Sequence, residues 1–298
     1  MRITIIAFLF LISFCKNANA QEVIVLYQGL ALGSLPVADK EVFTKPDKGR
    51  PFVSHVTNPT LTVFESKKPN SDRTSIIICP GGGYSRLSIE DGGYEAAKVF
   101  AEYGITAFVL KYRTWRDSAY IDYKTAPMLD LQQAINIVYQ GAAKWNLDTT
   151  RIGILGFSAG GHLAAMASTG LTFRKPAFSL LIYPVISFTD SLTSKTSTSR
   201  SVLLGANITN HLKNQYSPEL YINKVTPPAF LIHAADDSTA LVGNSIAYFN
   251  GLSANRIPAQ LHIYQKGEHG FALYNKMQDE YWMPSSIKWL VLNGFLKQ

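Results

Sequence analysis

A serine flanked by glycines, in the stretch Gly156-Phe157-Ser158-Ala159-Gly160, is the feature that most constrains the fold. A continuous apolar run over 151–157 precedes it, and an alanine-rich run over 159–168 follows it. This order predicts a buried strand, a sharp turn and a helix, with the Ser158 hydroxyl exposed at the turn. The positive end of the helix faces the same place. A helix N-cap serine after a loop glycine is the alternative, and the strand before the turn argues against it.

Short apolar runs alternate with helix-like stretches along most of the chain. We expect strands at 75–80, 105–112, 151–157, 178–186, 229–233 and 260–264, and helices at 94–103, 126–145, 159–168 and 286–296. Continuous apolar strands separated by helices indicate a mostly parallel sheet covered on both faces. Sites in such sheets form at the carboxyl ends of the strands, so the residues just after each strand are the candidates for chemistry.

A nucleophilic serine needs a base, and the base needs an acid that orients it. The histidines after Ser158 are His162, His211, His233, His262 and His269. His262 lies inside an alternating strand pattern, which is typical of a structural residue. His269 lies in a loop just after that strand, between Gly267 and Gly270. The sequence therefore predicts His269 as the base.

The acid is one of two neighbouring aspartates. Asp236 and Asp237 follow the expected strand at 229–233. One of them should accept the ring proton of His269, while the other caps the turn or accepts bonds from backbone amides. The spacing of the residues does not separate the two.

A glycine run offers backbone donors for an oxyanion. Gly81, Gly82 and Gly83 directly follow the strand at 75–80, and a second donor is available at the amide of Ala159. A plain glycine turn is the alternative interpretation. A phosphate loop is excluded because His162 stands where the lysine is required, and Arg86 stands where a dinucleotide fingerprint needs its third glycine.

Taken together, these segments resemble the α/β-hydrolase superfamily, and within it the secreted bacterial esterases grouped with acetylxylan esterases and other carbohydrate acetyl esterases. The segments that carry the resemblance are NPTLTV (58–63), ICPGGGY (78–84), FVLKYR (108–113), GFSAGGHLAA (156–165), TPPAFLIHAADD (226–237) and GEHGFAL (267–273). The resemblance implies an α/β-hydrolase fold for residues 21–298, with a mostly parallel central sheet and helices on both faces.

The resemblance also implies roles for individual residues. It selects Asp237 as the acid, and it places the oxyanion donors at Gly82 or Gly83 and at Ala159. It implies a serine esterase that works through an acyl-enzyme and needs no metal or organic cofactor. The implied substrates are acetylated saccharides derived from xylan or other plant-wall polymers. One alternative is a feruloyl or general carboxylesterase. Another is a non-catalytic binding protein with this fold, although the presence of all three triad residues argues against it.

Aromatic residues near the expected pocket could form platforms for sugar rings. The candidates for this rim are Tyr84, Trp115, Tyr120 and Trp282, although ordinary packing is the more common role of such residues. A different segment, 189–201, is rich in serine and threonine. We interpret it as a surface loop, with a lid over the site as the alternative.

The N-terminus resembles a targeting segment. A basic start, an apolar run over 3–14 and an Ala-x-Ala site ending at Ala20 are typical of a signal peptide covering residues 1–20. We therefore expect a secreted or periplasmic protein with no stable membrane span, and we consider lipid anchoring at Cys15 the weaker alternative because Phe14 before it is bulky. Cys79 lies in an apolar run, which predicts a buried thiol.

The charge of the chain argues against a nucleic-acid partner. The 298 residues carry a formal net charge of +7, but their lysines and arginines are scattered rather than clustered with aromatics. We expect a small ester or an acetylated saccharide as the partner. The sequence does not indicate an oligomeric state.

Overall fold

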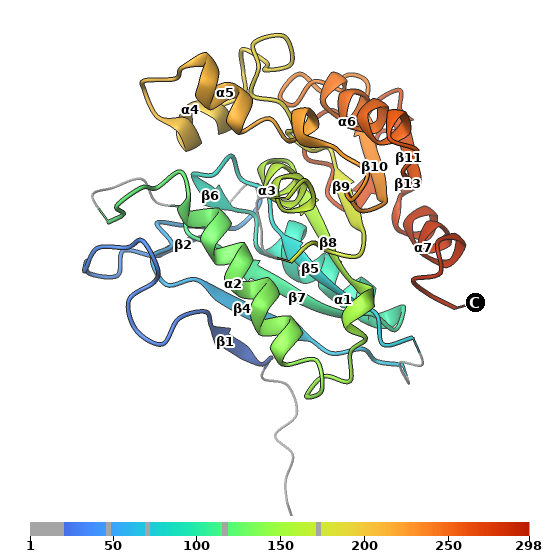
Figure 1. Ribbon diagram of the computed structural model, residues 1–298, viewed down its shortest axis with the longest axis horizontal. Helices are drawn as coiled ribbons and strands as arrows, with labels where there is room; N and C mark the ends of the chain where they lie inside the picture. The colour runs from blue at the N-terminus through green and yellow to red at the C-terminus, as the bar shows by residue number, and fades with distance from the viewer. Residues whose placement is uncertain (1–20, 46–48, 69–71, 115–118, 171–173, 298) are drawn as a thin grey trace, which may run out of the picture.

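A computed structural model describes residues 21–45, 49–68, 72–114, 119–170 and 174–297. The expected signal peptide at 1–20, Cys15 and Trp115 lie outside the described residues. The centre of the molecule is an eight-stranded sheet (Figure 1). Its strands, in spatial order, are β1 (Val23–Val25), β4 (Thr60–Phe64), β7 (Thr106–Lys111), β5 (Ser75–Cys79), β8 (Ile152–Phe157), β9 (Ser179–Ile182), β10 (Ala229–Ala234) and β11 (Ala259–Tyr264).

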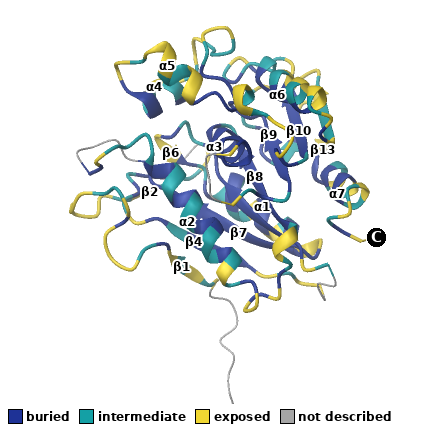
Figure 2. Ribbon diagram, viewed as in Figure 1, coloured by how far each residue is buried: buried dark blue, intermediate teal, exposed yellow. Residues whose placement is uncertain are grey.

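Six neighbouring strands, from β7 to β11, run parallel to one another. The strands β1 and β4 at one edge are antiparallel. Every residue of β5, β8, β9 and β10 is buried, as the dark blue centre of Figure 2 shows. A strand that is buried at every position is covered on both faces, as its continuous apolar sequence requires. The predicted α/β-hydrolase fold is confirmed.

The helices cover this sheet and complete the core. They are α1 (Glu95–Glu102), α2 (Ala126–Gln140), α3 (Ala159–Ser168), α4 (Ser199–Leu204), α5 (Asn210–Gln215), α6 (Gly243–Ala254) and α7 (Met283–Leu292), with shorter turns η1 (Glu90–Tyr94), η2 (Thr149–Arg151) and η3 (Pro218–Tyr221). All ten residues of α3 are buried, because this helix packs on β8 and β9 of the sheet and against the neighbouring helix α2. Its small residues allow that close packing.

Two small sheets lie outside the central one. The first joins β2 (Val42–Thr44), β3 (Phe52–Ser54) and β6 (Arg86–Leu87), and the second joins β12 (Tyr274–Asn275) and β13 (Glu280–Tyr281). Sequence patterns predicted neither of them, nor the edge strand β1 or helix α6. No helix in the described part of the chain is long and apolar enough to cross a membrane.

The register of the parallel strands places their carboxyl ends next to one another at one end of the sheet. Cys79 at the end of β5 lies beside Gly156 of β8, and Phe157 lies beside Ile182 of β9. Ala234 at the end of β10 lies beside Tyr264 of β11. The loops that follow these strands therefore meet, although up to 185 residues separate them in sequence, from 79 to 264.

A buried ion pair secures the end of β7. The Arg113 and Asp130 side chains are both 0% exposed, and Arg113 Nη2 lies 2.7 Å from Asp130 Oδ1. Asp130 also accepts a bond from the Arg113 backbone N–H at 2.8 Å. Arg113 donates further bonds to the Leu32 and Ala126 carbonyls. The pair thus joins the N-terminal segment, β7 and α2.

We expect Asp130→Ala to lower the free energy of unfolding by about 3–5 kcal/mol, because it leaves the Arg113 charge buried without a partner. Glu95→Ala is the matched control: its pair with Lys98 is about half exposed (54% and 52%), and such pairs contribute roughly 0.3–0.5 kcal/mol. Urea unfolding of the three proteins measures both values. Equal losses in the two variants would contradict this account of Arg113.

Candidate active site

Ser158 occupies a strained turn between β8 and α3. Its φ of 51° and ψ of −119° lie where non-glycine residues are rarely found. The turn is possible only because the flanking residues have no side chain: a Cβ on Gly156 would lie 2.2 Å from the Gly160 carbonyl oxygen, and one on Gly160 would lie 2.1 Å from that of Cys79. The Ser158 amide donates to the Ile182 carbonyl at 3.1 Å, which fixes the turn against β9.

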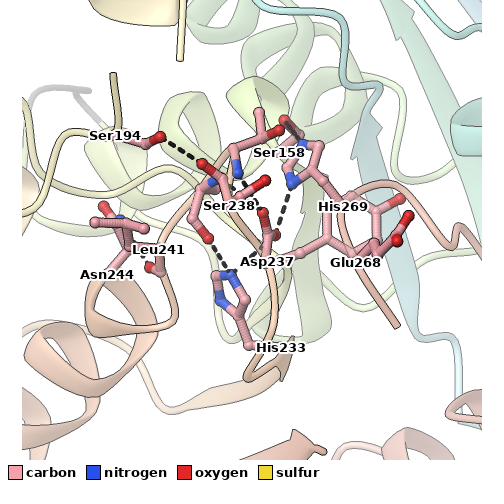
Figure 3. A network of polar contacts seen from close by, with 12 residues as sticks. Ser158, Ser194, His233, Asp237, Ser238, Leu241, Asn244, Glu268 and His269 are labelled. Carbon is pink, nitrogen blue, oxygen red and sulfur yellow. Dashed lines mark hydrogen bonds and ion pairs between the residues drawn. The ribbon is translucent and has the colours of Figure 1, made fainter. Parts of the chain in front are cut away.

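Three predicted residues form one chain of hydrogen bonds (Figure 3). Ser158 Oγ lies 2.8 Å from His269 Nε2, and His269 Nδ1 lies 2.7 Å from Asp237 Oδ2. An ionised carboxylate only accepts, so Nδ1 carries the proton and Nε2 accepts from the serine hydroxyl. This is the tautomer in which the ring can take the serine proton.

The Asp237 carboxylate is buried and held from several sides. Its Oδ1 accepts from the backbone amides of Thr239 and Ala240, at 2.9 and 2.8 Å. Burial opposes its ionisation, but hydrogen bonds from His233, His269 and the Ala240 amide outweigh burial and hold the pKa of Asp237 below its usual range. Asp237 therefore stays charged when the neighbouring ring gains a proton.

His233 is a supporting residue that the sequence reasoning did not assign. Its Nε2 donates to the Ala240 carbonyl at 2.7 Å and lies 3.3 Å from Asp237 Oδ2 (Figure 3). Its Nδ1 lies 2.7 Å from the Ser245 hydroxyl on α6. His233 and Asp237 are four residues apart in the sequence. That spacing alone does not show that the chain after β10 folds back and brings Asp237 and Ala240 against the His233 ring.

The two aspartates between which the sequence could not choose have different partners in the structure. Asp236 does not bond to His269; its Oδ1 accepts the backbone N–H of Glu268 at 2.9 Å. It therefore fixes the loop, while Asp237 contacts the ring. This arrangement agrees with the choice of Asp237 that the resemblance implied.

Three further side chains hold the loop that carries His269. Arg50 Nη1 donates to the Gly270 carbonyl at 2.7 Å, and the Ala272 amide donates to the Tyr183 hydroxyl at 3.1 Å. Trp282 Nε1 donates to the Ala272 carbonyl at 2.7 Å. The roles of Arg50 and Tyr183 were not predicted, because nothing local in the sequence connects them with His269.

Two of the expected rim residues prove to be interior. Trp282 is 0% exposed, so it cannot present a face to a sugar ring, and the prediction that it lines the rim is wrong. Tyr84 is 3% exposed, and its hydroxyl lies 2.6 Å from His162 Nδ1 inside the core, so the same prediction is wrong for Tyr84. Tyr120 is also buried, with its hydroxyl on the Val56 carbonyl. Trp115 lies outside the described residues.

The glycine loop after β5 faces the serine. A Cβ on Gly81 would lie 2.9 Å from the Phe157 carbonyl oxygen, which shows how closely the two turns approach. The Ser88 amide donates to the Gly81 carbonyl, and the Ser85 and Arg86 amides donate to that of Gly82. In a trans peptide the N–H points away from the preceding C=O, so the amides of Gly82 and Gly83 point away from residues 85–88.

These elements enclose a pocket of about 280 Å³. Ser158, His269 and the three glycines at 81–83 line it. Much of the remaining lining consists of hydroxyl side chains: Ser85, Ser88, Thr196, Thr198, Ser199 and Thr239. The serine- and threonine-rich segment 189–201 is thus one wall of the pocket. Thr196 Oγ1 donates to the Ser238 carbonyl at 2.7 Å, and Ser194 binds the same oxygen (Figure 3).

Comparison with known proteins identifies the family of this chain. The BD-FAE family model matches residues 61–252, which is more than half of the chain. The chain belongs to the BD-FAE family. The matched part contains Ser158 and Asp237 but ends before His269.

Two curated relatives of this BD-FAE chain are longer proteins. An acetylxylan esterase of Xylanibacter ruminicola is 36% identical over 205 residues, which cover 68% of this chain and 42% of that protein. An endo-1,4-beta-xylanase B of Butyrivibrio fibrisolvens is 30% identical over 217 residues, covering 68% of this chain and 33% of that protein. The chain therefore spans less than half the length of the curated relatives it matches.

Solved structures resemble the BD-FAE chain over nearly its whole length. An acetyl ester-xyloside bifunctional hydrolase from Caldicellulosiruptor lactoaceticus is 29% identical, with a TM-score of 0.72 over 92% of this chain and 97% of that chain. The carboxylesterase Cest-2923 from Lactobacillus plantarum shares the fold at 22% identity, with a TM-score of 0.68 over 88% of this chain and 100% of that chain.

Behind the site, His162 is a neutral, fully buried histidine. Its Nε2 donates to the Tyr216 carbonyl at 2.8 Å, which leaves Nδ1 to accept from the Tyr84 hydroxyl. Burial lowers the pKa of His162 to about 4, against the opposing effect of the bond to Tyr216. His162 thereby ties helix α3 to the end of the glycine loop.

This burial predicts a loss of stability in acid. Between pH 6.5 and 4, unfolded His162 binds a proton that the folded protein does not, so stability is full above pH 6.5 and decreases towards pH 4. The loss amounts to about 3 kcal/mol for this group. In urea unfolding from pH 7 to 4, the free energy of unfolding should decrease less for His162→Gln than for wild type, by about that amount. Parallel curves for the two proteins would contradict the assignment.

Proposed function

We propose that this chain hydrolyses carboxylic esters through Ser158, His269 and Asp237. The observation that carries the proposal is the continuous hydrogen-bond chain from the Ser158 hydroxyl through His269 to the buried Asp237 carboxylate, at 2.8 and 2.7 Å. A serine whose base is itself oriented by a charged acid is the arrangement that acyl transfer requires.

In the proposed mechanism, Ser158 Oγ attacks the ester carbonyl carbon while His269 Nε2 takes the hydroxyl proton. The carbonyl electron pair moves to the oxygen and returns as the bond to the alcohol breaks, with His269 giving its proton to the leaving oxygen. Water then attacks the acyl-enzyme by the same route, releasing the acid and restoring Ser158. Asp237 stabilises the positively charged ring in both halves.

Backbone amides would hold the negative oxygen of each tetrahedral intermediate. The Ala159 amide begins α3 beside Ser158, and the amides of Gly82 and Gly83 belong to the loop that lines the same pocket. Because the packing of the turns fixes these amides beforehand, they need not reorganise during the reaction. The positive end of α3 adds to the same field.

Acetylated saccharides derived from xylan are the substrates we propose. The names of the acetylxylan esterase and of the acetyl ester-xyloside hydrolase support this choice, as does the pocket lining, whose hydroxyls can exchange hydrogen bonds with a sugar. Among the described residues, the aromatic side chains that line the pocket are Phe157 and Tyr183, both almost fully buried. That lining offers little exposed ring surface for an aromatic acyl group such as ferulate.

Ser158→Ala should abolish acetate release from acetylated xylo-oligosaccharides and from an aryl acetate, because the hydroxyl that forms the acyl-enzyme is gone. We expect a drop in kcat of about 10⁶-fold, with an unchanged fold by circular dichroism. A fluorophosphonate probe should label wild type at Ser158 and leave the variant unlabelled, which mass spectrometry detects. If the probe labels wild type but wild type hydrolyses only the aryl acetate, the esterase proposal stands and the acetylated saccharide is excluded as the substrate.

The adjacent aspartates provide a matched pair of variants. Asp237→Asn should lower kcat by about 10⁴-fold, since the amide can present its N–H to His269 and favour the wrong tautomer. Asp236→Asn should lose far less, because its Oδ1 can still accept the Glu268 amide. Steady-state kinetics on an aryl acetate measure both. Similar losses in the two variants would refute the assignment of Asp237.

A further inference from the structure

Arginine side chains belong to the lining of the pocket around Ser158. Two arginines, Arg50 and Arg86, line it together with His269, and no carboxylate belongs to the described lining. The nearest acid of the proposed mechanism, Asp237, is 0% exposed and lies behind His269. A ligand entering the pocket therefore meets guanidinium and hydroxyl groups, and the two arginines differ in how free they are to bind it.

Arg50 is bonded to other groups of the protein. Its Nε lies 2.8 Å from Asp91 Oδ2, and its Nη1 donates to the Gly270 carbonyl at 2.7 Å. Its charge is balanced by Asp91, and its hydrogen bonds hold the loop that carries His269. Arg50 is thus a positioning residue rather than a free cation.

Arg86, unlike Arg50, has no carboxylate partner among the described residues. It is exposed, and within the described part of the chain no carboxylate lies at ion-pair distance from its guanidinium. The guanidinium carbon lies 4.6 Å from the centre of the Phe52 ring, on the neighbouring strand β3. A face packed on an aromatic ring limits the motion of the group while its N–H edge stays available for an anion.

The stem of Arg86 lies directly beside the proposed oxyanion loop. Its Cγ is 3.2 Å from the position that a Cβ on Gly82 would occupy, and its carbonyl oxygen is 2.0 Å from it. Gly82, with φ of +140°, accepts this contact because it has no side chain. Arg86 therefore lies at the wall of the same pocket that Ser158 lines.

We infer that Arg86 binds a carboxylate of the substrate, so that the preferred ester is an acidic saccharide, such as an acetylated xylo-oligosaccharide that bears a uronic acid. The guanidinium edge matches a carboxylate with two parallel hydrogen bonds. Hydroxyls of Ser85 and Thr198, which line the pocket with it, suit the sugar that carries the acid. The net charge of +7, which becomes +5 without Arg2 and Lys16 of the expected signal peptide, attracts such an anion at longer range. This inference rests on the proposed esterase function.

The test compares two substrates that differ in one charge. One is an acetylated xylo-oligosaccharide carrying glucuronic acid, and the other is the same compound with the uronic carboxyl converted to a neutral methylamide. For wild type, kcat/KM should be about tenfold higher for the acid at low salt, through a lower KM. The preference should fall towards unity in 1 M NaCl, where the screening length is about 3 Å.

Variants of the two arginines separate recognition from positioning. Arg86→Gln should abolish the preference, Arg86→Lys should keep part of it, and Arg86→Glu should reverse it in favour of the neutral substrate. Arg50→Gln is the matched control: we expect it to lower kcat on both substrates and leave their ratio unchanged. Fluorophosphonate labelling of each variant establishes that Ser158 is still reactive.

The outcomes distinguish this inference from the function on which it rests. If wild type hydrolyses neither saccharide nor an aryl acetate, the esterase proposal fails and the inference with it. If wild type hydrolyses both saccharides equally well, or if Arg86→Gln keeps the preference, the esterase stands and the role of Arg86 is refuted. An equal loss of kcat on both substrates in Arg86→Gln would also refute it, since the charge would then act on the transition state.

Discussion

The contact between two backbone turns, one after β5 and one after β8, is the constraint on which the rest of the site depends. Gly160 packs against the Cys79 and Pro80 carbonyls, and Gly81 packs against the Phe157 carbonyl. This contact brings the serine and the backbone amides to one pocket. The strain at Ser158, about 1–3 kcal/mol for such a backbone, persists because β8 and α3 on either side are fully buried.

The proposed base, His269, is positioned in a different way from Ser158. His269 belongs to a loop that four side chains hold: Arg50, Tyr183 and Asp236 from distant parts of the chain, and Trp282 from the segment that follows the loop. Each of these bonds is to a backbone group of the loop, so together they fix the backbone on either side of His269. Displacement of a catalytic group by about 1 Å can cost 10²-fold in rate, which explains why so many contacts converge here.

The sequence predicted the elements whose signals are local. The buried strands are continuous apolar runs, and the turn at Ser158 is marked by its glycines, so local patterns predicted the fold and proposed Ser158 and His269. They left Asp236 and Asp237 open, and only the family resemblance favoured Asp237. Trp282 and Tyr84 were misplaced because an aromatic residue has the same local pattern on a rim as in a core. The edge strand β1 has three residues, too few for a pattern, and the bonds of Arg50, Tyr183 and His233 connect segments that only the fold brings together.

The groups proposed for the chemistry and those proposed for specificity therefore lie in different parts of the molecule. The reacting groups follow the strands of the central sheet, whereas the walls of the pocket come from β6, Arg50 and segment 189–201. A positive wall favours both a substrate anion and the developing oxyanion. The two effects differ in when they act: attraction of a carboxylate is present in the bound substrate and lowers KM, whereas stabilisation of the oxyanion appears only in the transition state and raises kcat. The Asp237 carboxylate lies behind His269 with its side chain 0% exposed, so it does not line the pocket beside Arg86.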